Sequence, residues 1–181
     1  MLTTPTEVTT VLIPRDSAIR SVYQSVCLSD AYSIVVPHGT TTDPEQLARH
    51  VFAQQSFWVR GLLVVRDTAV AGLGLKTTRH LTTLASEGSA DRVGFFKVYG
   101  KSENEIILGE DDKHLDFRLS LLLEARNERT GNRSLVLSTV VQCHNLLGRA
   151  YIVAIEPFHR LVAKSSLRQA AIAGWPKAAN T

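Results

Sequence analysis

Three polar residues at a spacing of two, His114, Asp116 and Arg118, are the first candidates for chemistry in this sequence. In an extended strand, alternate residues point to one face and lie about 7 Å apart. Such a row would supply a base, a carboxylate that orients it and a clamp for an anion. The plainer alternative is a solvated strand face that carries weak ion pairs.

His144 and Arg149 flank a predicted junction between a strand and a helix. Free backbone amides at the start of a helix attract anions, and Gly148 would permit close approach there, with Arg149 as a further partner. Alternatively, Asn145 caps the helix and Arg149 pairs with an acid such as Asp116. We favour the cap, because asparagine is common at this position for stability alone.

No other pattern of residues predicts a metal site, a cofactor or a known catalytic motif. The acidic turn Glu110-Asp-Asp-Lys113 lacks the ligand spacing of a calcium loop. The two cysteines, Cys27 and Cys143, are far apart and have no metal-like spacing, so we expect neither a disulfide framework nor a zinc site. This cysteine usage favours a reducing, cytoplasmic compartment. His159 is interpreted as a surface or packed histidine.

Length and composition predict one globular domain with a sizeable core. The chain has 181 residues, of which 44% are hydrophobic and 20% charged. The N-terminus does not resemble a signal peptide, and no apolar run is long enough to span a membrane. The net charge is +3, with basic residues in excess after Arg126. Nucleic acid is not an expected partner, because no aromatic or glycine-rich motif accompanies them. The sequence leaves the oligomeric state open.

The order of the predicted elements begins with a partly irregular N-terminal extension, residues 1–29. A strand at 31–36 follows, and Asp43-Pro44-Glu45 predicts the start of a helix. A second apolar stripe from Phe57 predicts another helix, and residues 77–91 have the composition of a loop. Alternating apolar residues separated by polar turns then predict an antiparallel meander with strands at 95–99, 105–108, 114–124 and 134–144.

A long helix is predicted at the C-terminal end of the chain, over about residues 147–173, with a bend or restart at Pro157. Gly174, Trp175 and Pro176 end it. Its wide apolar stripe is expected to face a core. The stripe consists of Tyr151, Ala154, Ile155, Phe158, Leu161 and Val162.

This order of elements resembles the helix-grip, START-like (Bet v 1-like, SRPBCC) architecture. The resemblance implies an α+β fold in which a curved antiparallel sheet wraps around the long C-terminal helix. It implies a single domain over residues 30–175 and a short tail, 176–181. A twisted sheet with a helix laid across it leaves a tapered gap, and such gaps often become pockets for apolar ligands.

The chain also resembles a bacterial family catalogued as domain of unknown function 2867, over about residues 30–170. Members of that family occur fused to NAD(P)-binding dehydrogenase-like domains. This chain has no glycine-rich dinucleotide loop, so no cofactor role is carried over, and the resemblance implies no catalytic residues. The motifs that carry it are Trp58-Val-Arg-Gly-Leu62 with Arg66-Asp67, Gly109-Glu-Asp-Asp-Lys-His-Leu-Asp-Phe-Arg118, His144-Asn-Leu-Leu-Gly-Arg149-Ala-Tyr151 and Pro157-Phe-His159-Arg160.

Three functions are compatible with this sequence. The first is a module that binds a small apolar ligand in a cavity between the sheet and the terminal helix. The second is an enzyme of the cyclase, hydratase or isomerase kind, which would use the row from His114 to Arg118 inside that cavity. The third is a regulatory or partner-binding domain. The predicted lining of the cavity comprises Trp58, Leu62, Phe117, Leu119, Tyr151, Ile155 and Phe158.

Overall fold

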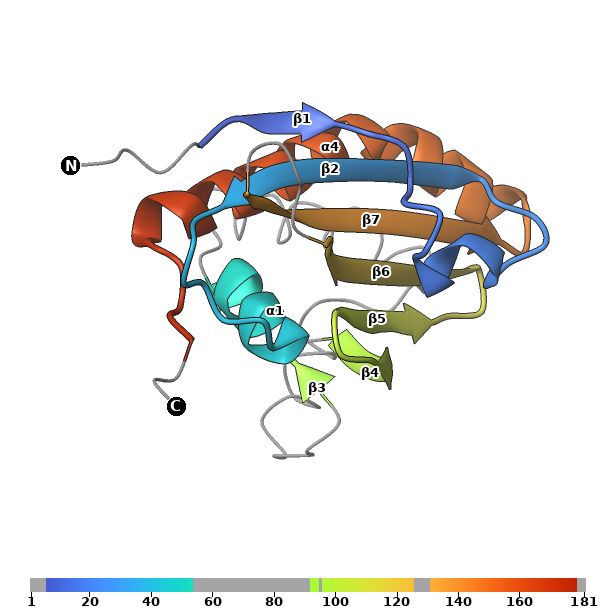
Figure 1. The fold of residues 1–181 in the computed structure, drawn as a ribbon. Helices are drawn as coiled ribbons and strands as arrows, with labels where there is room; N and C mark the ends of the chain where they lie inside the picture. Colours follow the sequence, from blue (N-terminus) through green and yellow to red (C-terminus); the bar gives the residue numbers. More distant parts are fainter. Residues whose placement is uncertain (1–5, 54–91, 95, 126–130, 179–181) are drawn as a thin grey trace.

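The computed structural model describes residues 6–53, 92–94, 96–125 and 131–178 (Figure 1). The predicted α+β class is confirmed: a curved antiparallel sheet is accompanied by a long C-terminal helix. The predicted helix from Phe57 and the loop at 77–91 lie outside the described residues. The elements are β1 (Val8–Thr10), the 3-10 helix η1 (Ala18–Ser21), β2 (Leu28–Val36), α1 (Pro44–Ala53), β3 (Arg92–Val93), β4 (Phe96–Lys101), β5 (Glu105–Asp111), β6 (Leu115–Leu123), β7 (Arg133–Cys143) and α4 (Leu146–Ala173).

The sheet has the strand order β1-β2-β7-β6-β5-β4-β3, and every neighbouring pair is antiparallel. Strands β4 to β7 form the predicted meander. Strand β2 is not followed in the sheet by the next strand of the chain. It pairs along its whole length with β7, for example Ile34 with Leu135. This pairing brings the residues around position 30 next to those around position 139.

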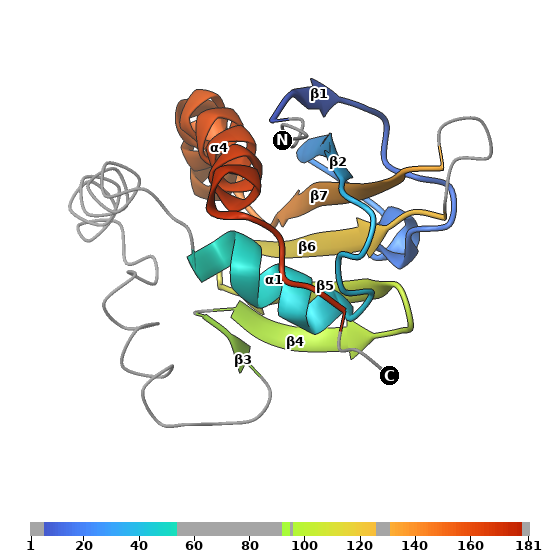
Figure 2. The same cartoon turned by 60° about the vertical axis from the view of Figure 1, so that its left-hand side comes forward.

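The two faces of the sheet have different coverings. On the inner face, alternate residues of β6 such as Leu119 and Leu121 are buried against α1 and α4, and Figure 2 shows both helices on this side. On the outer face, the segment around η1 covers part of the sheet, and Ser17 and Ile19 are buried there. The alternation predicted for residues 114–124 therefore corresponds to a helix-covered face and a face partly covered by the N-terminal segment.

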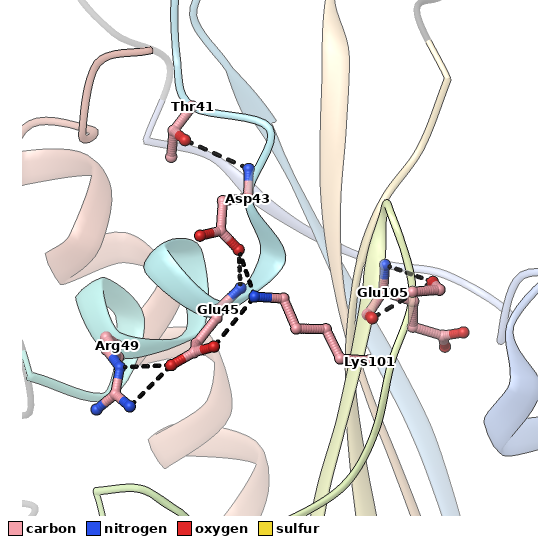
Figure 3. Close-up of polar contacts among 7 residues, drawn as sticks. Thr41, Asp43, Glu45, Arg49, Lys101 and Glu105 are labelled. Carbon is pink, nitrogen blue, oxygen red and sulfur yellow. Dashed lines mark hydrogen bonds and ion pairs between the residues drawn. The ribbon is translucent and has the colours of Figure 1, made fainter. Parts of the chain in front are cut away.

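Helix α1 begins where the sequence predicts it. The Asp43 carboxylate accepts a hydrogen bond from the Glu45 amide at 3.0 Å, and Pro44 occupies the first helical position. Lys101 of β4 reaches this end of the helix, and its Nζ lies 3.1 Å from Asp43 Oδ1 and 3.0 Å from Glu45 Oε2 (Figure 3). Arg49 completes the network by binding Glu45. These contacts attach the start of α1 to strand β4.

Helix α4 does not bury the stripe that its sequence predicts. Tyr151 and Ile155 are partly buried, but Phe158 and Leu161 are 47% and 57% exposed. Apolar residues occur almost all round this helix, so periodicity alone does not select one face. Of the predicted bend or restart at Pro157, the restart does not occur, because the helix runs through Pro157 as a single element of 28 residues. The buried face consists of Gly148, Ile152, Ala163, Ser166, Leu167, Ala170 and Ala171.

The expected absence of a disulfide is wrong. Cys27 and Cys143 form a disulfide bond, with their Cα atoms 6.2 Å apart. The pairing of β2 with β7 brings these two positions together, because Leu28 lies directly opposite Val141. The cysteines therefore give no argument for a reducing compartment. Among the described residues, no helix is long and apolar enough to cross a membrane.

Candidate functional site

Arg118 lies on the outer face of the sheet, opposite α4, and its charge is compensated there. Its guanidinium donates to Asp111 Oδ1 at 2.7 Å and lies over the Tyr99 ring, 3.5 Å from the centroid. Burial by itself raises the pKa of Asp111, but hydrogen bonds from Arg118 and Tyr99 outweigh it and lower that pKa. Gly109 leaves room for this side chain, since a Cβ there would lie 2.8 Å from Arg118 Cδ. Arg118 is thus held in place by groups of the protein itself.

Asp116 also faces away from α4, because it alternates with Leu115 and Phe117, which pack beneath the helix. Its carboxylate lies 3.1 Å from His144 Nε2 and accepts a hydrogen bond from the Asp112 amide at 3.1 Å. The pairing of Asp116 with Arg149 that the sequence left open is therefore replaced by a pairing with His144. His144 itself is exposed at the end of β7.

His114 belongs to the start of α4 rather than to a row with Asp116. Its Nδ1 lies 2.9 Å from Asn145 Nδ2, and Asn145 Oδ1 accepts a hydrogen bond from the Gly148 amide at 3.0 Å. The predicted cap is confirmed. Gly148 does permit a close approach, but the group that approaches is the His114 carbonyl, 2.2 Å from where a Cβ would lie. Arg149 is exposed on the first turn.

The five predicted polar residues are thus dispersed. Arg118 is stacked on an aromatic ring, Asp116 contacts His144 near the surface, His114 joins the helix cap, and Arg149 is exposed on the first turn of α4. Asp116 and Arg118 do not face the space between the sheet and α4. The geometry gives no support to an enzyme that would use this row inside such a space.

A different polar cluster lies on the inner face, beneath α4. His159 of α4 places Nε2 3.2 Å from Asp30 of β2, and the two side chains are 22% and 10% exposed. The Tyr32 hydroxyl donates to the same carboxylate at 3.1 Å. Thr139 of β7 lies directly opposite Asp30 in the sheet register. We call Asp30, Tyr32, Thr139 and His159 the inner cluster.

The hydroxyl groups of Tyr32 and Thr139 differ in their hydrogen bonding. Burial raises the pKa of Tyr32, and the neighbouring Asp30 charge adds to this effect, so the phenol stays protonated as a donor. Thr139 is only 3% exposed, and its hydroxyl has no hydrogen-bond partner among the described residues. Buried hydroxyls are normally paired. The cluster therefore combines a satisfied carboxylate with an unsatisfied polar group.

Apolar side chains continue the inner face beyond the inner cluster, because Leu28 lies two residues from Asp30 on β2 and Val141 lies two residues from Thr139 on β7. Tyr151 and Ile155 of α4 are partly buried against a small cluster of Leu28, Leu115, Val141 and Ile152, and Phe117 joins this cluster to the main core. Of the other predicted lining residues, Leu119 is buried in the main core and Phe158 is largely exposed, whereas Trp58 and Leu62 lie outside the described residues.

Sequence reasoning missed most of the inner cluster. Asp30 directly precedes a predicted strand and Thr139 lies within another, and neither position carries a recognisable motif. The interpretation of His159 as a surface or packed histidine does not include its partner, an acid 129 residues away. In the sequence, the cluster is indicated only by the presence of a histidine, His159, on the long terminal helix.

A second buried acid lies on the outer face. Glu105 Oε1 accepts hydrogen bonds from the hydroxyls of Ser17 and Ser120, each at 2.5 Å, and Oε2 accepts one from the Ala18 amide at 3.0 Å. These bonds attach the N-terminal segment to β5 and β6. Within the described ranges, no group of three or more histidine, cysteine or acidic side chains is arranged to hold a metal ion.

The family model described as a protein of unknown function (DUF2867) matches residues 22–166. The chain belongs to this family. The DUF2867 match spans β2 to β7 and most of α4, and it contains every residue of the inner cluster. No curated protein and no solved structure matches the chain. The more specific START-like resemblance stays a prediction.

Proposed function

We propose that this DUF2867 domain binds a small, largely apolar molecule between the inner face of the sheet and α4. The apolar part of the ligand would contact Phe117, Tyr151 and Ile155, which are partly buried. Its polar group would lie at the inner cluster. The START-like resemblance supports the same location, because it implies a tapered gap beneath the terminal helix.

The observation that carries this proposal is the unpaired hydroxyl of Thr139 beside the Asp30–His159 pair. Leaving a buried hydroxyl unpaired costs about 1–3 kcal/mol. A ligand that placed one hydrogen-bonding group against Thr139 would recover that cost, while its apolar body was removed from water. Ligand sites of this kind combine mostly apolar walls with a few polar groups.

Native mass spectrometry tests the proposal directly. We expect the purified chain to carry a bound small molecule that denaturation releases, or to acquire one on incubation with medium-chain alcohols and hydroxyaromatic compounds. Ile155→Arg would place a charge against the apolar wall and abolish this binding.

Leu161→Arg is the matched control, because Leu161 lies on the same helix but is largely exposed, so binding should be retained. Absence of any bound species in the wild-type chain under both conditions would contradict the proposal. Equal binding by the Ile155 variant would place the site elsewhere.

A further inference from the structure

We infer that His159 is a general base, with Asp30 as its positioning residue, and that the domain catalyses proton transfer from its bound ligand. This inference rests on the proposed binding function, since the base needs a ligand held beside it. It assigns the proton transfer to the inner cluster and not to the row from His114 to Arg118.

The contact between His159 and Asp30 determines which imidazole nitrogen is available. Nε2 lies 3.2 Å from each carboxylate oxygen of Asp30, so this nitrogen carries the proton that the carboxylate accepts. In a neutral imidazole the lone pair then resides on Nδ1. Among the described residues, no group forms a hydrogen bond with that atom. Nδ1 is therefore the atom that can accept a proton from a ligand.

The surroundings of Asp30 keep its carboxylate in position. The Tyr32 hydroxyl donates to Oδ2, and burial, with the Asp30 charge in second place, raises the pKa of this phenol, so it remains a donor at neutral pH. The carboxylate thus receives hydrogen bonds from two elements, β2 and α4. The carboxylate in turn holds the imidazole ring of His159 in one orientation.

The pair of His159 with Asp30 differs in its surroundings from the pair of His144 with Asp116. His144 and Asp116 form a pair of the same kind at 3.1 Å, but they lie at the other face of the sheet, and the His144 side chain is 35% exposed. The apolar cluster that includes Tyr151 and Ile155 lies on the inner face of the sheet, and the Asp116 side chain faces away from it. A base acts most effectively where electrostatic interactions are not weakened by water.

The substrate class follows from these groups. It is a small apolar molecule with an acidic C–H bond beside an electron-withdrawing group. The C–H bond breaks, a bond forms between the proton and His159 Nδ1, and the electron pair either moves onto an oxygen of the substrate or expels a leaving group. The Thr139 hydroxyl can donate to the oxygen on which negative charge develops. The imidazolium then returns its proton to the product or to water.

The test uses 5-nitrobenzisoxazole, an apolar carbon acid. Loss of its C3 proton breaks the N–O bond and releases a coloured cyanonitrophenolate, which absorbance follows. We expect the wild-type chain to show saturable elimination, with His159→Gln about a hundredfold slower. Asp30→Asn should lower kcat roughly tenfold while KM stays unchanged, because the substrate still binds but the imidazolium loses its partner. Asp30→Glu should restore part of kcat.

His144→Gln is the matched control and should leave the elimination unchanged. Binding of 5-nitrobenzotriazole, which has the same shape but no C3 proton, is measured separately, and its inhibition of the wild-type elimination is independent of the folding of any variant. If the benzotriazole binds but wild-type elimination is no faster than that of the His159 variant, the inference is overturned and the binding proposal stands. If the benzotriazole does not bind to the wild type, both are contradicted for this class of compound.

Discussion

Cys27 and Cys143 are 116 residues apart in sequence and are joined by a disulfide bond. The bond connects the residue before β2 to the last residue of β7, three positions before α4 begins. Cys143 also contacts the apolar cluster that contains Leu28 and Ile152. The bond therefore fixes the strand pair on which the first turns of α4 rest, next to the proposed ligand site.

Reduction of this disulfide is expected to lower the free energy of unfolding. A bond that closes a loop of this length contributes about 4–5 kcal/mol in the chain-entropy model, because it restricts the unfolded chain. Urea unfolding with and without a phosphine reductant measures the difference. The Cys27→Ser, Cys143→Ser double variant should be insensitive to the reductant. An unchanged wild-type midpoint after confirmed reduction would show that the bond does not stabilise the fold.

Replacement of the buried Glu105 by alanine is expected to release the N-terminal segment. The substitution removes the acceptor of Ser17, Ser120 and the Ala18 amide, and each buried donor left unpaired costs about 1–3 kcal/mol. Hydrogen exchange should become faster at residues 17–21 than in the wild-type chain. Glu103→Ala, at an exposed position of the preceding turn, is the control and should leave exchange unchanged. Equal protection in both variants would rule out this attachment.

Lys101→Met is expected to destabilise the chain at neutral pH and not at acid pH. Hydrogen bonds from Arg49 and then Lys101 lower the pKa of Glu45, and Lys101 lowers that of Asp43 against the opposing effect of burial. Carboxyls whose pKa is lower in the folded state stabilise it above the unfolded pKa, and this contribution is lost as the pH falls from about 4 toward 2. Because these groups are partly exposed, we expect the substitution to lower the free energy of unfolding by about 0.5–1 kcal/mol at pH 7.

Urea unfolding at about pH 7 and at about pH 2 measures how far the Lys101 substitution lowers the free energy of unfolding at each pH. Lys113→Met removes an exposed lysine that forms no ion pair within the described part of the chain, and the stability of this variant should match the wild type at each pH. A loss of stability in the Lys101 variant that persisted at low pH would assign the effect to packing of the lysine stem instead of its charge.

Short-range features of this chain could be predicted from sequence. The start of α1 follows from Asp43-Pro44-Glu45, and the cap of α4 follows from Asn145, because both depend on groups within three or four residues. The alternation of β6 likewise predicts its two faces, since a strand has a period of two. In each case the deciding contacts are local.

Sequence alone determined an α+β chain with an antiparallel meander and a long terminal helix, because hydrophobic periodicity and capping are properties of neighbouring residues. The tertiary structure decided the rest. The insertion of β2 beside β7 created both the disulfide and the meeting of Asp30 with Thr139. Packing selected the face of α4, leaving Phe158 exposed and directing His159 toward Asp30. Contacts between residues more than a hundred positions apart depend on the order of strands, which no local pattern in this chain encodes.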